Sequence, residues 1–246
     1  MAWFFTENNI KSEHHIITGE DAKHISKVLR MKQGEELVIV TPDRTQYECE
    51  VFSISSDSVT VEIISKKPCE NEPNVEVTLY QALPKSDKMD FIIQKCVELG
   101  ITKIVPVISS RCISRPDAKS LKKKQERWQK IALQAAMQSR RGIIPKVCDC
   151  ISFEKAAELT KANEKTIIFY ELGGEHIGNI IPNTPKSIGM FIGSEGGFEQ
   201  SEVDLIINNG GSAATLGKRI LRAETAPLAA LSVIMYQTGN FYHLGG

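Results

Sequence analysis

The feature of this sequence that most constrains its fold is a change of pattern around residues 66–74. Before this segment, short β-branched or alternating stretches follow a single helical one, whereas after it strands and helices alternate to the end of the chain. The segment itself is polar, carries two prolines and has no periodicity, so it is predicted to be a linker. We therefore expect a small domain over residues 1–70 and a larger one over residues 75–246.

The small domain is predicted to be rich in β-strands. Residues 20–31 place Ile25, Val28 and Leu29 at helical spacing, and Gly34 closes this helix. Three strands follow it, separated by turn-forming pairs, over residues 37–40, 47–54 and 59–64.

The larger domain reads as an α/β unit. Strands are predicted over residues 75–83, 104–108, 166–172, 187–192 and 213–216. Helices are predicted over residues 86–99, about 118–141, 153–159 and 199–209, and after Thr225. Such alternation favours a mostly parallel sheet covered by helices.

Composition excludes several other classes of protein. With 41% apolar and 24% charged residues, the chain of 246 residues is neither disordered nor a coiled coil. It has no apolar run of membrane length and no basic-then-apolar leader, so we expect a cytoplasmic protein. The six cysteines lack zinc-site spacing, which favours free, mostly buried thiols and no metal site.

Charge is unevenly distributed although the net charge is zero. Residues 85–146 hold 15 Lys and Arg against 5 Asp and Glu. A solvated helix face and a polyanion-contacting surface explain this excess equally well on charge alone. Within the long helix, five polar residues recur at steps of three and four and form one stripe, which favours RNA contact for the group: Arg127, Lys130, Gln134, Gln138 and Arg141.

Two loops that leave predicted strands are unusual, and ligands bind at such loops in open α/β sheets. The first, residues 192–198, runs from an apolar strand through three glycines, which let a ligand approach the backbone closely. It matches neither phosphate-binding glycine motif, and the acidic residues Glu199 and Glu202 that follow disfavour an anion. Taken alone, this loop is better explained as a tight strand-to-helix turn.

The second loop, residues 216–227, carries three cations around an apolar pair. Ile220 and Leu221 are costly to expose, and Thr225 is a plausible N-cap for the helix that follows. A pocket between the two loops, roofed by this pair, suits a flat apolar ring with polar edges such as adenine.

These residues resemble a known family. Gly-Ser-Glu-Gly-Gly-Phe at 193–198 and Leu-Gly-x-Arg-Ile-Leu-Arg-x-Glu-Thr-Ala at 216–226 resemble the ribosomal RNA small subunit methyltransferase E family, knotted methyltransferases of the SPOUT class. Further matches over nearly the whole chain are His24 with residues 28–30, residues 81–85 with Lys95 and residues 98–100, and Gln138-Ser139 with Arg141 and Pro145. The chain departs from the family pattern at Trp3, Ser194 and Met137, where arginine, proline and glutamate are common.

The resemblance implies a fold, a reaction and partners. The fold is a PUA-like RNA-binding β-barrel over residues 1–70 and a SPOUT trefoil-knot methyltransferase domain over residues 75–246. The reaction is methylation by S-adenosyl-L-methionine (AdoMet) of N3 of one uridine in 16S ribosomal RNA. The enzyme is expected to be a homodimer that acts during ribosome biogenesis, on RNA within the small ribosomal subunit.

The resemblance also implies site residues. The expected cofactor contacts are Leu172, Gly193, Glu195, Gly196, Leu216, Gly217, Ile220 and Leu221. The expected RNA contacts follow instead from the basic region: Gln138 and Arg141 of the polar stripe together with Lys88, Arg111 and Arg140, to which Arg30 of the small domain is added.

Arg222 is predicted to be the catalytic residue. Uridine N3 must lose its proton to become a nucleophile, and arginine can stabilise the resulting anion because it stays charged. The alternative role for Arg222 is a surface ion pair with Glu224. No histidine lies near either loop, so the proton acceptor is unassigned, with Glu224 as one candidate. Two other functions stay open: a non-catalytic RNA-binding factor for ribosome assembly, and the same chemistry on transfer RNA.

Overall fold

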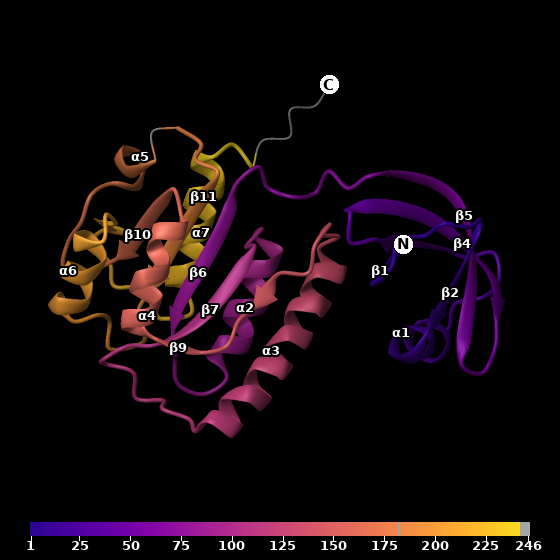
Figure 1. Ribbon diagram of the computed structural model, residues 1–246, viewed down its shortest axis with the longest axis horizontal. Helices are drawn as coiled ribbons and strands as arrows, with labels where there is room; N and C mark the ends of the chain where they lie inside the picture. Colours follow the sequence, from indigo (N-terminus) through magenta and orange to yellow (C-terminus); the bar gives the residue numbers. More distant parts are fainter. Residues whose placement is uncertain (182, 242–246) are drawn as a thin grey trace. The chain divides into compact units, whose positions relative to one another are not determined.

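The computed structural model describes residues 1–181 and 183–241, which form two compact units (Figure 1). The first unit consists of Met1–Glu72 together with Ala136–Ile143. The second consists of Pro73–Ala135 and the described residues from Ile144 onward. The chain therefore returns to the first unit for one short segment.

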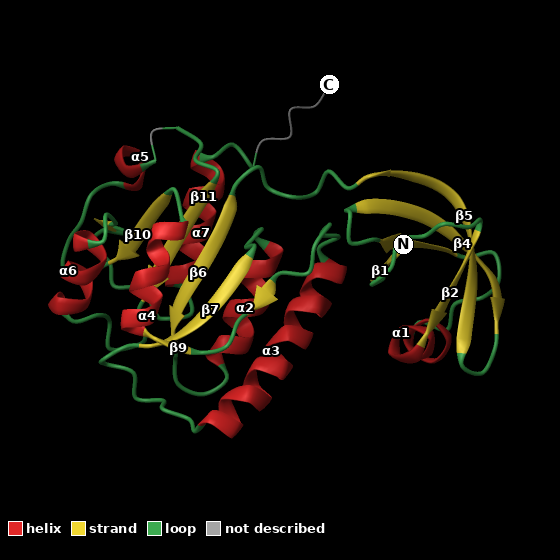
Figure 2. Cartoon of the chain, viewed as in Figure 1, coloured by secondary structure: helices red, strands yellow, loops and turns green. Residues whose placement is uncertain are grey.

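The first unit is built on a five-stranded sheet in the order β1-β3-β4-β5-β2 (Figure 2). β1 pairs with β3 in parallel, and the other neighbours are antiparallel. Its core is formed by apolar side chains from all five strands and from Ala22 and Ile25. The strands are β1 (Ala2–Phe5), β2 (His14–Thr18), β3 (Glu36–Val40), β4 (Thr45–Ile54) and β5 (Ser58–Pro68).

Three features of this unit differ from the sequence-based prediction. β1 and β2 are additional strands. The helix over 20–31 is shorter, with α1 (Gly19–Lys23) running into a π-helical turn (His24–Val28), and Arg30 then adopts a left-handed φ of 54°. Lys66–Pro68, predicted as linker, pair with Thr45–Tyr47 and belong to β5. Pairing with a distant strand, which periodicity does not reveal, explains these strand assignments.

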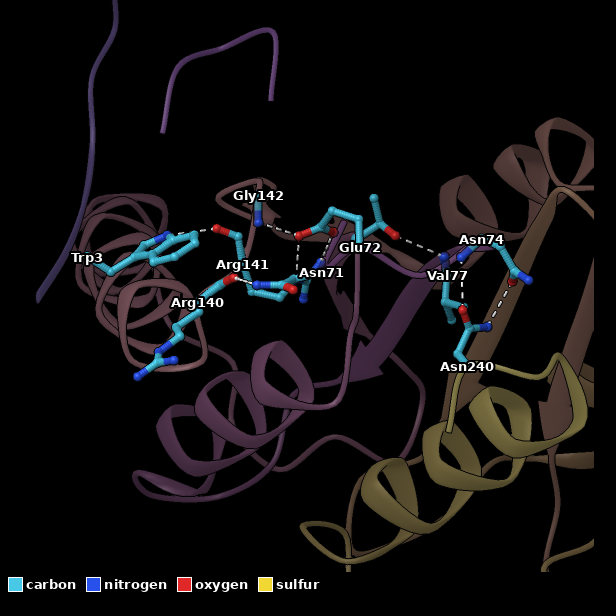
Figure 3. Close-up of polar contacts among 10 residues, drawn as sticks. Trp3, Asn71, Glu72, Asn74, Val77, Arg140, Arg141, Gly142 and Asn240 are labelled. Atoms are coloured by element: carbon cyan, nitrogen blue, oxygen red, sulfur yellow. Dashed lines mark hydrogen bonds and ion pairs between the residues drawn. The ribbon is translucent and has the colours of Figure 1, made fainter. Parts of the chain in front are cut away.

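The segment at residues 136–143 is bound tightly into the first unit (Figure 3). The Arg141 guanidinium pairs with the Glu72 carboxylate at 2.8 and 2.6 Å, and the Gly142 N–H donates to the same carboxylate at 2.7 Å. The Trp3 indole N–H donates to the Arg141 carbonyl at 3.0 Å, so the residue that departs from the family pattern has a structural partner. The Arg141 side chain is buried and that of Glu72 is nearly so, which makes this cluster an internal element of the unit.

The second unit contains a seven-stranded sheet in the order β12-β10-β11-β6-β7-β8, with β9 also paired to β7. Every pairing is parallel, which confirms the predicted sheet. The strands are β6 (Glu76–Ala82), β7 (Lys103–Ile108), β8 (Lys146–Val147), β9 (Ile151–Ser152), β10 (Lys165–Phe169), β11 (Ser187–Ile192) and β12 (Ser212–Ala214).

Helices cover the apolar side chains of this sheet. α2 packs against α7, and α4 packs against α6. Val77, Leu79, Ile104, Ile167 and Met190 are fully buried in the sheet between them. The helices are α2 (Lys88–Glu98), α3 (Ala118–Gln138), α4 (Phe153–Glu158), α5 (Ile177–Ile180), α6 (Gln200–Asn208) and α7 (Ala226–Gln237), with a 3-10 turn at Leu159–Ala162. Among the described residues, no helix combines the length and apolar character needed to span a membrane.

Candidate functional site

A cavity of about 470 Å³ lies in the second unit, at the carboxyl ends of β10, β11 and β12. Three loops line it, one from each strand: residues 169–171, 192–197 and 215–223. Lys88, the first residue of α2, completes the lining from another part of the chain. The two unusual loops identified in the sequence therefore meet at one pocket.

The first loop, residues 193–197, needs its glycines chiefly because it folds back on itself. The Gly197 N–H donates to the Ser194 carbonyl at 3.0 Å, and Gly197 has a left-handed φ of 67°. A Cβ on Gly193 would lie 3.0 Å from the Gly197 Cα, and one on Gly196 would lie 2.9 Å from the Arg111 Cβ. The sequence suggested that these glycines let a ligand approach the backbone. The structure adds a second reason, which is that the loop is packed too tightly for a side chain at Gly193 or Gly196.

The second loop, residues 215–223, presents its apolar pair at the cavity. Ile220 is 85% exposed, and Leu221 is half-buried. The N–H groups of Thr225 and Ala226 each donate to the Arg222 carbonyl at 2.9 Å where the chain turns into α7. Thr225 is the N-cap as predicted, but its side chain makes no capping hydrogen bond. An exposed isoleucine beside a cavity is a surface suited to an apolar ligand.

Lys88 links the two loops. Its Nζ lies 2.9 Å from the Glu195 Oε1 of the first loop and 3.0 Å from the Glu224 Oε2 that follows the second. Pairing with these carboxylates raises the pKa of Lys88, and pairing with Lys88 lowers the pKa of Glu224. Partial burial of Glu195 acts to raise its pKa, but pairing with Lys88 and backbone hydrogen bonds lower it overall. All three groups are therefore charged at neutral pH.

Arg222 is exposed and lines the same cavity. It makes no side-chain hydrogen bond or ion pair with any other residue that the structure describes. Its charge still contributes to lowering the pKa of Glu224. The alternative role considered for Arg222, an ion pair with Glu224, is not present, because Glu224 pairs with Lys88.

Most of the predicted cofactor contacts come together at this cavity. Its lining includes Gly193, Glu195, Gly196, Leu216, Gly217, Ile220 and Leu221. Leu172 is not part of the lining and is 78% exposed. It lies two residues beyond Tyr170, which does line the cavity. Glu171, which also lines the cavity, was not among the predicted contacts, although it is the residue next to Leu172 on the same loop.

Ser194 is a second lining residue that was not among the predicted cofactor contacts. It is 7% exposed, and its Oγ is buried with no hydrogen-bond partner among the described residues. Its signal in the sequence was the departure from the common proline. An unpaired buried hydroxyl at a cavity is available to a bound ligand.

The predicted RNA contacts fall into two groups. Arg30, Gln138 and Arg140 are exposed, and Arg111 is exposed with its Nη1 donating to the Gly196 carbonyl at 3.1 Å. The other two, Lys88 and Arg141, have carboxylate partners within their own units. Because Arg141 is 3% exposed and paired with Glu72, its guanidinium serves the interior of the first unit.

The rest of the predicted polar stripe on α3 is exposed. Lys130 and Gln134 face solvent, whereas Trp128, Ala132 and Ala135 on the opposite face are buried, as the periodicity predicts. Arg127 is exposed and forms an ion pair with Asp90 of α2.

The cysteines are free thiols, as predicted. Cys49, Cys96 and Cys112 are buried, and the other three are half-buried. Within residues 1–181 and 183–241, no group of three or more His, Cys, Asp or Glu side chains is arranged to hold a metal ion.

Comparison with known proteins identifies the class to which this fold and pocket belong. The family model of the RNA methyltransferase domain matches residues 70–235, and that of the RNA methyltransferase PUA domain matches residues 17–64. The α/β fold with a parallel sheet, joined to a PUA-like N-terminal domain, is thereby confirmed.

Individual relatives define the family more closely. The chain is 38% identical over 229 residues to the ribosomal RNA small subunit methyltransferase E of Bacillus subtilis, covering 90% of each chain. The crystal structure of a ribosomal RNA small subunit methyltransferase E from Neisseria gonorrhoeae bound to S-adenosyl methionine matches with a TM-score of 0.87 and 32% identity, over 98% of this chain and 100% of that one. The chain belongs to the ribosomal RNA small subunit methyltransferase E family, which confirms the resemblance seen in its motifs.

Proposed function

We propose that this protein transfers a methyl group from AdoMet to N3 of one uridine in the 16S RNA of the small ribosomal subunit. The observation that carries the proposal is the cavity in which both family loops meet, with Arg222, unpaired among the described residues, as part of its lining. Relatives named as ribosomal RNA small subunit methyltransferases support the substrate class.

The cavity fits the cofactor in size and chemistry. Its volume of about 470 Å³ lies in the range of small-molecule pockets. Ile220 and Leu221 offer an apolar surface for adenine, and the unpaired Ser194 hydroxyl and the backbone of residues 193–197 offer polar contacts. When bound, AdoMet supplies an electrophilic methyl group on a sulfonium. The proposed contacts within the lining are Gly193, Glu195, Gly196, Leu216, Gly217, Ile220 and Leu221. Leu172, which lies outside the lining, is proposed from the family resemblance.

Arg222 is proposed to stabilise the uridine anion. Loss of the N3 proton spreads negative charge onto O2 and O4, and a guanidinium fork holds such charge without deprotonating. The side chain is exposed and unpaired among the described residues, so no internal ion pair has to break before it binds substrate. Glu224 is a poor candidate for the proton acceptor, because pairing with Lys88 lowers its pKa.

RNA binding is proposed to use exposed cationic and polar side chains of both units. Arg30, Arg111, Gln138 and Arg140 are the proposed contacts, with the stripe on α3 that includes Lys130. Contacts of this kind neutralise phosphates and position the RNA, but they do not read its sequence. Binding should therefore weaken steeply as salt concentration rises.

A homodimer with knotted strands, acting in the cytoplasm, completes the proposal. Phe91 on α2 and Val233 and Tyr236 on α7 are 45%, 40% and 56% exposed, and these two helices pack together. A surface with three large apolar side chains is suited to contact with a second copy. Sedimentation analysis should give twice the mass of the chain.

The test is transfer of labelled methyl from AdoMet to three substrates: undermethylated small ribosomal subunits, protein-free 16S RNA and transfer RNA. We expect label in the ribosomal RNA and none in the transfer RNA. Label in transfer RNA alone would show that transfer RNA, and not ribosomal RNA, is the substrate. Cofactor binding without transfer to any RNA would favour the other alternative, a non-catalytic assembly factor.

A further inference from the structure

Lys88 occupies a position where a cation is normally unfavourable. It is the first residue of α2, and the N-terminus of a helix carries partial positive charge. Its side chain instead finds its partners outside the helix, in the Glu195 and Glu224 carboxylates. The placement of this lysine is therefore explained by the two loops that line the cavity.

The two carboxylates differ in their other partners. Glu195 also accepts a hydrogen bond from the Lys85 N–H, at 3.2 Å. Glu224 makes no ion pair with any other described residue, and its buried Oε2 makes no hydrogen bond, so the ion pair with Lys88 at 3.0 Å is the contact that this oxygen has. Lys88 is thus the group that fixes Glu224, whereas Glu195 is held twice.

Arg222 is the cation that would compete for Glu224. It lies two residues away in the chain, is exposed, and lines the same cavity as Lys88. If Lys88 were absent, an uncompensated carboxylate and an unpaired guanidinium would remain two residues apart at the cavity. The carboxylate would attract this guanidinium, because the Glu224 side chain is only 24% exposed and its Oε2 is buried.

We propose that Lys88 is a positioning residue that holds Glu224 away from Arg222, so that the Arg222 guanidinium remains free for the substrate anion. This inference rests on the proposed role of Arg222. It replaces the direct RNA contact that the sequence suggested for Lys88, and it gives Glu224 a structural task in place of proton transfer.

The experiment compares Lys88→Met, Glu224→Gln and the double variant in single-turnover methyl transfer with saturating AdoMet. Lys88→Met should lower the rate by about fivefold to tenfold, because one partly exposed ion pair then competes with substrate for Arg222. Glu224→Gln alone should leave the rate within about twofold of wild type. The double variant should recover most of the lost rate, because glutamine carries no charge to capture Arg222.

Other roles for these residues give different results. If Lys88 bound RNA phosphate, Lys88→Met would raise the KM for RNA and Glu224→Gln would not restore activity. If Glu224 accepted the proton, Glu224→Gln alone would abolish turnover. Either pattern would overturn the inference.

Two controls isolate the effect. Lys95→Met with Glu98→Gln removes another lysine–glutamate pair of α2, joined at 2.7 Å and outside the cavity lining, and should not change the rate. Arg222→Ala tests the underlying proposal by itself. If Arg222→Ala keeps full activity, the role of Arg222 fails. If Arg222→Ala is inactive but Lys88→Met with Glu224→Gln does not recover activity, the role of Arg222 stands and the inference about Lys88 is wrong.

Discussion

Two charged clusters, one in each unit, join parts of the chain that are far apart in sequence. In the first unit, Arg141 pairs with Glu72, and these side chains are 3% and 9% exposed. In the second, Lys88 pairs with Glu195 and Glu224, and the three side chains are 24% to 29% exposed. The first cluster is closed by a further backbone N–H from Gly142, whereas the second borders an open cavity.

This difference in burial predicts a difference in task. Removing one member of a buried ion pair leaves the other charge buried with neither water nor a partner around it. The loss therefore strongly lowers the stability of the folded state. A partly exposed pair contributes little to folding because water replaces the lost partner. It still fixes the direction of its side chains, which matters beside a site where charge has to develop. We therefore expect the Glu72–Arg141 cluster to stabilise the fold of the first unit, and the Lys88 cluster to orient side chains at the cavity.

The largest expected effect is on the first cluster. Arg141→Met should lower the free energy of unfolding by about 3–5 kcal/mol, because Glu72 remains buried without its partner. Urea unfolding monitored by Trp fluorescence measures it. Adding Glu72→Gln should recover much of this loss. If Lys88→Met lost as much stability as Arg141→Met, the two clusters would not differ in their contribution to folding.

The next effect concerns catalysis. Arg222→Ala should lower methyl transfer by about 10²–10³-fold, the usual result of removing one anion-stabilising donor. Thermal unfolding and calorimetric AdoMet binding should stay near wild type, because Arg222 has no internal partner among the described residues. A wild-type rate in this variant would refute the catalytic role.

A smaller effect is expected in the first glycine loop. Gly196→Ala would place a Cβ 2.9 Å from the Arg111 Cβ, so the loop must shift. Calorimetry should show AdoMet affinity reduced by about tenfold, equivalent to about 1.4 kcal/mol. Unchanged affinity would show that the loop geometry is not needed for the cofactor. Ser194→Ala, which adds no atoms, tests the proposed Ser194 contact separately, and loss of its hydroxyl should weaken AdoMet binding by itself.

The smallest effect is on pH dependence. The pKa values of Glu195 and Glu224 are lowered from 4.5, so their contribution is present above pH 4.5 and is lost as pH falls through the lowered values. The pKa of Lys88 is raised from 10.5, so its contribution is present below pH 10.5 and is lost above it. The difference in melting temperature between wild type and Lys88→Met should therefore be constant from about pH 5 to pH 10. A change centred near pH 7 would contradict these charge assignments.

Local sequence patterns predicted much of the second unit. The strand over Ser187–Ile192 agrees to the residue, and the two loops after β11 and β12 meet at a cavity as expected. Glycines, an apolar pair and caps are local signals, so they can be read from one stretch of sequence.

Partnerships between distant residues could not be predicted. Arg141 looked like a surface cation on a polar stripe, but its partner, Glu72, lies 69 residues away. Lys88 looked like an RNA contact for the same reason. A charged residue gives no sign in the sequence of whether its partner is RNA or another side chain. Only the packing of separate segments decides between them.

The most direct test of the central claim is the identity of the methylated nucleoside. Small ribosomal subunits methylated by the wild-type protein would be digested and analysed by nucleoside mass spectrometry, with Arg222→Ala as the matched control. We expect 3-methyluridine from the wild-type reaction and almost none from the variant. A different methylated nucleoside, or equal 3-methyluridine from both proteins, would contradict it.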